Sequence, residues 1–187
     1  MIKYFESFEI LDGKTYFTER FSDMYYFIAD CFHHHWLRLR TSFSSQFVAG
    51  YHGTYIMFGE NPMHKCFPTA FLITTDSATV IHGSEDVYLG LPQLIIEAKC
   101  DTNSHVIDKK ISLYKRYGIQ EIWVIDTRTF KVQVLRRDTC ESDYDLTSII
   151  TTSISNLSLD LSHIFDEKLV YPIPHRYERG GDNHYIL

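Results

Sequence analysis

The pattern of apolar and polar positions is clearest between residues 91 and 135, where it predicts a strand, a helix and two further strands. Leu94, Ile95 and Ile96 form a short apolar run typical of a buried strand. After a polar turn at 101–104, apolar residues recur at helical spacing as far as Gly118, where the helix is expected to end. The apolar run at 122–125 and the alternating residues at 131–135 predict a hairpin. We therefore expect an α/β domain with a central mixed β-sheet flanked by helices.

The flanking segments supply further elements of the same kind. Alternation and an Asp-Gly turn predict a hairpin over 4–17, and a broad apolar surface predicts a helix over 24–40. Strand-like residues fill 43–57, a loop is expected over 58–66, and an apolar strand follows residue 69. Past the hairpin we expect a loop at 140–144, a strand at 145–152 and a short closing helix around His163. One domain is expected over residues 1–171, with a C-terminal arm or flexible tail over 172–187.

Composition limits the classes of protein that the chain can form. With 187 residues, 44% of them hydrophobic, the chain can bury one core, and no apolar run approaches the roughly 20 residues of a membrane span. The N-terminus does not resemble a signal peptide, and the four scattered cysteines predict free thiols, so we expect a cytoplasmic protein without a membrane partner. The net charge of −6 argues against a broad basic surface. Two local basic clusters could contact phosphates or remain solvated. One lies at 109–116 and includes Lys109, Lys115 and Arg116, and the other is Arg136-Arg137.

Glu97 and Lys99 are the first candidates for chemistry. They lie two residues apart at the end of an apolar strand, so their side chains share one face. A carboxylate there can hold a divalent cation against a phosphodiester, and a lysine beside it can orient water or stabilise charge. The alternatives are a structural salt bridge within the sheet and a small-molecule enzyme that uses the same pair.

A wider set of residues carries a family resemblance. Glu97-Ala98-Lys99 is followed by Lys110, by Tyr114 one helical turn later and by the segment at 118–126, GIQEIWVID. This set resembles the core of the Uma-type putative restriction endonuclease family, which belongs to the PD-(D/E)XK nuclease superfamily. The segments FEILDG at 8–13 and SISNLSLDLSHIF at 153–165 are similar to the opening and closing motifs of that family. The resemblance therefore extends over most of the chain.

The resemblance implies a metal-dependent endonuclease that hydrolyses DNA phosphodiester bonds with Mg²⁺ (or Mn²⁺). Glu97 would hold the metal, Glu9 would be a direct or more distant ligand, and Lys99 or Lys110 would act as the catalytic lysine. For Glu9 an ordinary exposed strand position is the alternative, because it alternates with Phe8 and Ile10. Nucleases of this superfamily often act as homodimers, and the resemblance implies that this chain could form one.

Thr69 departs from the family pattern. The family carries Pro-Asp where this chain has Pro68 and Thr69, and a neutral hydroxyl is a poor substitute for a carboxylate as a Mg²⁺ ligand. Asp76 could replace the missing acid, although its Thr-Asp-Ser context first indicates a turn. The alternative to a nuclease is therefore a catalytically degenerate protein of the same fold that acts as a nucleic-acid-binding or interaction module.

Overall fold

The computed structural model describes residues 7–18, 21–43, 47–51, 54–59, 64–74, 79–81, 86–101, 103–139, 141–154 and 158–165. Within these ranges two six-stranded sheets and three helices form an α/β domain, as the sequence predicts. The predicted tail at 172–187 and Asp76 lie outside the described residues. Among the helices in these ranges, none is long and apolar enough to cross a membrane.

The central sheet has the strand order β12-β11-β10-β9-β6-β3. β9 and β10 are parallel and the other neighbouring strands are antiparallel, so the sheet is mixed. Its strands are β3 (Phe47–Tyr51), β6 (Ala70–Thr74), β9 (Leu94–Lys99), β10 (Glu121–Asp126), β11 (Lys131–Arg136) and β12 (Ser142–Asp145). The strands predicted at 94–99, 122–125 and 131–135 are thus confirmed, and β9 lies near the middle of the sheet. β12 occupies residues predicted to form a loop, because it pairs with β11 despite its polar sequence.

The outer sheet has the order β2-β1-β5-β4-β8-β7 and was not predicted as a separate layer. Its strands are β1 (Ser7–Leu11), β2 (Lys14–Thr18), β4 (Thr54–Phe58), β5 (His64–Cys66), β7 (Thr79–Ile81) and β8 (Asp86–Leu89). The N-terminal hairpin is confirmed as β1 and β2. β5 begins at His64, inside the segment predicted to be a loop.

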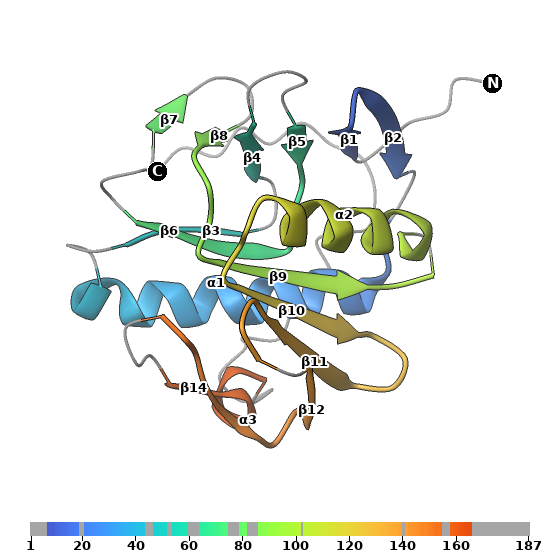
Figure 1. Ribbon diagram of the computed structural model, residues 1–187. Coiled ribbons are helices and arrows are strands. Elements are labelled where there is room, and N and C mark those ends of the chain that lie inside the picture. The colour runs from blue at the N-terminus through green and yellow to red at the C-terminus, as the bar shows by residue number, and fades with distance from the viewer. Residues whose placement is uncertain are drawn as a thin grey trace, which may run out of the picture.

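Helices cover both faces of the central sheet. α1 (Asp23–Phe43) lies along one face, and α2 (Ser104–Arg116) lies on the opposite face, on the side of the outer sheet (Figure 1). Alternation in β9 assigns the faces: Leu94 and Ile96 pack in the α1 core, whereas Ile95 packs with α2. Glu97 and Lys99 therefore point toward α2. A small sheet of β13 (Ile149–Thr151) and β14 (Ser158–Asp160), followed by α3 (Leu161–Ile164), closes the domain.

Gly50 allows β3 to pack under a buried aromatic ring. It pairs with Phe71 across the β3–β6 ladder, and a Cβ atom at Gly50 would lie only 2.0 Å from the Cζ atom of Phe71. Phe71 is fully buried and packs edge-on against Tyr88, so its ring cannot move freely. We expect Gly50→Ala to lower the free energy of unfolding by about 1–3 kcal/mol in urea titrations. Phe71→Leu should reduce that loss when combined with Gly50→Ala, and purely additive effects would contradict the predicted clash.

Candidate functional site

Three charged side chains meet between β1, β9 and α2. The Nζ atom of Lys110 lies 2.7 Å from Oε1 of Glu97 and 2.8 Å from Oε1 of Glu9. The three side chains are almost completely buried, with at most 5% of each exposed. Removing an acid from water is costly unless it is paired, and here two carboxylates share one ammonium group. The described structure therefore places Glu9, Glu97 and Lys110 in one cluster.

The cluster is fixed by the main chain between β5 and β6. Lys110 donates from Nζ to the carbonyl oxygen of Phe67 at 2.9 Å, and the Phe67 N–H donates to Oε1 of Glu9 at 2.8 Å. Tyr114, one turn after Lys110 on α2, donates from its hydroxyl to Oε1 of Glu97 at 2.7 Å. The sequence motif points to Tyr114, whereas nothing in the sequence indicates the main-chain contacts of Phe67.

Glu97 has one carboxylate oxygen that the cluster leaves open. Its Oε1 atom accepts from Lys110 and Tyr114, but its Oε2 atom is buried with no hydrogen-bond partner among the described residues. Burial raises the pKa of Glu97 to about 7, against the opposing effect of Lys110. An unsatisfied buried oxygen is costly, so this atom is where an additional cation or proton would be most stabilising.

Burial and nearby charges together set the protonation states of the other titratable groups of the cluster. Burial alone would lower the pKa of Lys110, but the carboxylates of Glu9 and Glu97 raise it above its ordinary value, so this amine stays protonated. Burial raises the pKa of the Tyr114 hydroxyl and of the Cys66 thiol well above their usual ranges. Both groups therefore remain neutral near pH 7, and Tyr114 acts as a hydrogen-bond donor to Glu97.

Lys99 and Thr69 occupy different surroundings. Lys99 is one-third exposed and its Nζ atom lies 3.4 Å from Oδ1 of Asp108, so its ammonium group lies outside the buried cluster. Thr69 is fully buried beside Glu97, since its N–H donates to the Ile96 carbonyl and its Oγ1 atom accepts from the Ala98 N–H at 2.8 Å. The hydroxyl of Thr69 thus forms a hydrogen bond that holds the loop before β6 against β9.

Asn103 stabilises the chain immediately after the site. Its Oδ1 atom accepts from the Cys100 N–H at 2.8 Å, and its Nδ2 atom donates to the Ala98 carbonyl at 2.9 Å. These bonds fix the turn between β9 and α2, and with it the relative positions of Glu97 and Lys110. The polar turn before the helix was the only signal in the sequence for this residue.

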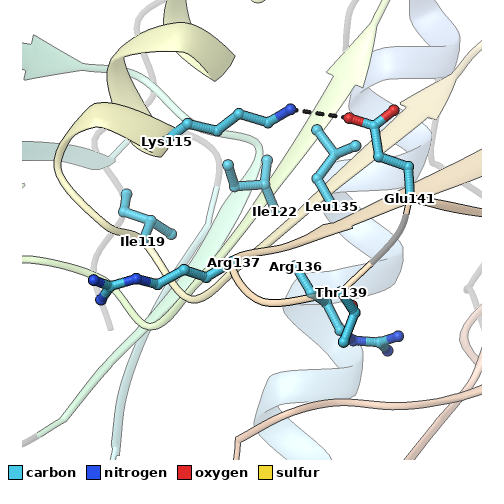
Figure 2. Close-up of a pocket in the computed structure, with 8 residues that line it drawn as sticks. All are labelled: Lys115, Ile119, Ile122, Leu135, Arg136, Arg137, Thr139 and Glu141. Carbon is cyan, nitrogen blue, oxygen red and sulfur yellow. Dashed lines mark hydrogen bonds and ion pairs between the residues drawn. The ribbon is translucent and has the colours of Figure 1, made fainter.

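The basic residues of α2 point in two directions. Lys109 is exposed and donates to the Tyr16 hydroxyl at 3.4 Å, and Arg116 pairs with Asp12, so both face the β1–β2 hairpin. Lys115 instead pairs with Glu141 at 2.9 Å, across a separate cavity (Figure 2). The three predicted phosphate contacts therefore do not form one surface.

The metal ligands predicted from the sequence are brought together only in part. Glu9 and Glu97 share Lys110, and within the described ranges no group of three or more His, Cys, Asp or Glu side chains is arranged to hold a metal ion. Mg²⁺ is commonly held by one or two carboxylates together with water and substrate phosphates, so two acids with an open oxygen meet its chemical requirement. The two carboxylates thus fit a hard divalent cation if the Lys110 ammonium gives up one of its contacts with Glu9 and Glu97.

Comparisons with known proteins agree with the fold. A crystal structure of a putative nuclease of the DUF820 group from Anabaena variabilis aligns with a TM-score of 0.67, covering 86% of this chain and 90% of that protein. At 18% sequence identity, the alignment shows a common fold. No curated protein sequence matches significantly. The profile of the Uma2 family, described as putative restriction endonuclease, matches residues 66–165, more than half of the chain, which includes Glu97, Lys110 and Tyr114. The chain therefore belongs to the Uma2 putative restriction endonuclease family.

Proposed function

We propose that the chain is a Mg²⁺-dependent endonuclease that hydrolyses DNA phosphodiester bonds. The observation that carries the proposal is the buried Oε2 atom of Glu97, which has no donor among the described residues although Glu9 and Lys110 lie beside the same carboxylate. Oxygen ligands of this type suit a divalent cation, and Mn²⁺ would fit equally well. Membership of the Uma2 family is in keeping with this reaction.

In this proposal Glu97 and Glu9 hold the cation, which when bound activates water and offsets charge on the phosphate. Tyr114 keeps Glu97 in one orientation through its 2.7 Å hydrogen bond. Lys110 remains protonated and supplies positive charge next to the phosphate oxygens as negative charge develops. Lys99, on the same face of β9 and one-third exposed, can contact the phosphate from the solvent side.

A second candidate is favoured by Thr69 and by the burial of the cluster. Thr69 offers a neutral hydroxyl that already accepts from the Ala98 N–H, and Lys110 is paired with both acids. Glu97 and Lys110 expose at most 2% of their side chains, so a phosphodiester reaches them only after a local movement. A protein that keeps the nuclease fold and binds nucleic acid without cutting it would have these features.

Metal binding tests the nuclease proposal directly. We expect calorimetry to detect Mg²⁺ or Mn²⁺ binding to the wild-type chain that Glu97→Gln abolishes, while the exposed control Glu141→Gln leaves it unchanged. Supercoiled DNA should then be nicked by the wild type and by Glu141→Gln, but not by Glu97→Gln. Metal binding without nicking would favour the non-catalytic candidate. Absence of metal binding, both alone and with DNA present, would overturn the proposal.

Restoring an acid at position 69 should strengthen the site. The antiparallel register that pairs Ala70 with Ile96 brings residue 69 beside Glu97, so Thr69→Asp adds a third carboxylate there. We expect Mg²⁺ affinity to rise about tenfold, because more ligand charge tightens a hard-cation site, and nicking to increase with it. Thr79→Asp, at an exposed strand position, is the matched control. Activity that appears only in Thr69→Asp would show that the natural chain is degenerate, and unchanged affinity would exclude residue 69 from the metal site.

A further inference from the structure

A groove lies between the β1–β2 hairpin and α2, on the solvent side of the buried cluster. Its volume is about 360 Å³, at the lower end of the range for small-ligand pockets. The hairpin contributes one wall and α2 the other, with Leu11 and Leu113 as apolar parts of the lining. Its polar lining consists of Asp12, Lys14, Tyr16, Asp108, Lys109, Ser112 and Arg116.

The register of the hairpin places this groove next to the candidate active site. Glu9 and Tyr16 are directly opposite one another in the β1–β2 ladder, so their side chains share the face that is turned toward α2. On α2, Lys110 contacts Glu9 while its neighbour Lys109 contacts Tyr16. Two consecutive helix residues thus connect the buried cluster to the groove.

Positive charge exceeds negative charge along the groove. Arg116 pairs with Asp12, and both are more than half exposed. Asp108 is 3.4 Å from Lys99, which lies outside the groove lining. Such exposed ion pairs contribute little stability. Arg116 can therefore exchange Asp12 for a phosphate, and Lys99 can exchange Asp108 for one. Lys109 already lies 4.6 Å from the centre of the Tyr16 ring and donates to a phenol instead of a carboxylate.

A second cavity that α2 borders has a different character. It measures about 240 Å³ and is lined by Lys115, Arg136, Arg137 and Glu141 around an apolar floor (Figure 2). Lys115 is neutralised by Glu141 at 2.9 Å, and Arg136 donates to the buried Glu121 and to the Thr151 carbonyl. This cavity does not adjoin Glu9, which makes Lys115 a useful control on the same helix.

We propose that the groove binds the sugar-phosphate backbone of a nucleic-acid strand, with Lys14, Lys109 and Arg116 contacting phosphates. The strand then passes beside Tyr16 and presents its next phosphodiester to the Glu9–Lys110–Glu97 cluster. This inference rests on the proposed function for the nature of the ligand, but binding does not depend on cleavage. Because phosphate contacts release counterions, the affinity must fall with salt in proportion to the number of contacts.

The test measures binding without metal or cleavage. Glu97→Gln protein in a chelating buffer is titrated into fluorescently labelled duplex DNA and, separately, into the same single strand, and anisotropy is followed over a range of salt concentrations. We expect Lys109→Met to weaken binding about fivefold to tenfold near 0.1 M salt, and to reduce the slope of log affinity against log salt by about 0.7–0.9. Lys14→Met should have the same effect. Lys115→Met, made in the same background, should leave affinity and slope unchanged.

The outcomes distinguish DNA binding in the groove from DNA cleavage at the cluster. Loss confined to the Lys14 and Lys109 variants supports the groove, and the substrate that shows it identifies duplex or single strand as the ligand. An equal loss of DNA affinity with Lys115→Met would overturn the proposal, because the attraction would then come from the general charge of the protein. No loss with Lys109→Met would also overturn it, because the DNA would then bind elsewhere. DNA binding that follows this pattern in a wild-type chain that neither binds metal nor nicks DNA would retain the groove and reject the nuclease proposal.

Discussion

Replacing Lys110 with methionine is expected to lower the free energy of unfolding by about 3–5 kcal/mol, the usual cost of leaving a buried charge without its partner. The substitution removes the only ammonium that contacts both Glu9 and Glu97 in the described structure, at 2.8 and 2.7 Å. It also leaves the Phe67 carbonyl without the donor at 2.9 Å. Because a domain of this size is stable by only about 5–15 kcal/mol, the variant should be strongly destabilised in urea titrations.

The loss in Lys110→Met should depend on pH in a defined direction. In the wild type, burial already raises the pKa of Glu97 from 4.5 to about 7, and without Lys110 that pKa must rise further. An acid whose pKa is raised on folding contributes its stabilisation below its unfolded pKa and loses it as pH rises through the folded pKa. We therefore expect Lys110→Met to be least destabilised near pH 5 and most destabilised above pH 7, when unfolding is measured across that range.

Two controls separate the buried charge from the loss of a long side chain. Lys109→Met removes a neighbouring but exposed lysine, whose contact with the Tyr16 ring is worth about 0.5–1 kcal/mol. Neutralising the acids together with the lysine, as Glu9→Gln, Glu97→Gln and Lys110→Met combined, should recover much of the lost stability. A loss in Lys110→Met that is as small as in Lys109→Met, or that does not vary with pH, would show that the carboxylates do not depend on Lys110.

The central sheet could be predicted because its sequence signals are local and agree with one another. β9 and β10 are continuous apolar runs, as expected for parallel strands buried on both faces, and α2 has helical spacing and ends before Gly118. Gly118 has a φ of 76°, the left-handed conformation that favours glycine after a helix. The family resemblance follows from the same residues, and the Uma2 match covers them.

Apart from its β1–β2 hairpin, the outer sheet could not be predicted, because its other strands are short and pair with distant segments. β5 has three residues and pairs with β1, more than 50 positions earlier, and with β4. Its lysine, Lys65, is 8% exposed and lies 3.7–3.8 Å above the rings of Phe8 and Tyr55. A lysine buried between aromatic rings interrupts the hydrophobic pattern by which a strand is predicted. No local feature of the sequence therefore distinguishes this strand from a loop.

The candidate site could be predicted only in part from the sequence, because the sequence does not show which of the two lysines contacts Glu97. Strand alternation puts Lys99 on the same face as Glu97, and that argument alone favoured Lys99 as the partner. In the structure Lys99 extends past the strand end to Asp108, whereas Lys110 reaches Glu97 from the facing helix. Which of two lysines is buried depends on how α2 packs on β9, and spacing along the chain does not contain that information.

Replacing Glu121 with alanine is the second substitution with a large expected effect, about 3–5 kcal/mol of unfolding free energy. Glu121 is completely buried at the start of β10. Its Oε1 atom accepts from Trp123 Nε1 at 2.7 Å and from Arg136 at 3.3 Å, and its Oε2 atom accepts from the Ser153 N–H at 2.6 Å and from its hydroxyl at 2.7 Å. Alanine would leave these donors and the Arg136 charge without their acceptor.

Because Glu121 accepts hydrogen bonds from Ser153, part of the lost stability should be confined to the closing segment of the domain. Glu121 connects the central sheet to the chain that follows β13, so its removal should loosen β13, β14 and α3 before the rest of the domain unfolds. We expect amide hydrogen exchange to accelerate at Ile150 and Leu159, which pair across β13 and β14, more than at Ile95 or Val124 in the central sheet.

The matched control for Glu121→Ala is Glu141→Ala. Glu141 is 54% exposed and pairs with Lys115 at the surface, so its loss should cost at most about 1 kcal/mol. Glu121→Gln preserves the shape and one acceptor oxygen, and should fall between the two. Equal losses for Glu121→Ala and Glu141→Ala would mean that the buried carboxylate does not stabilise the fold. A uniform acceleration of exchange would mean that Glu121 stabilises the whole domain and has no particular effect on its closing segment.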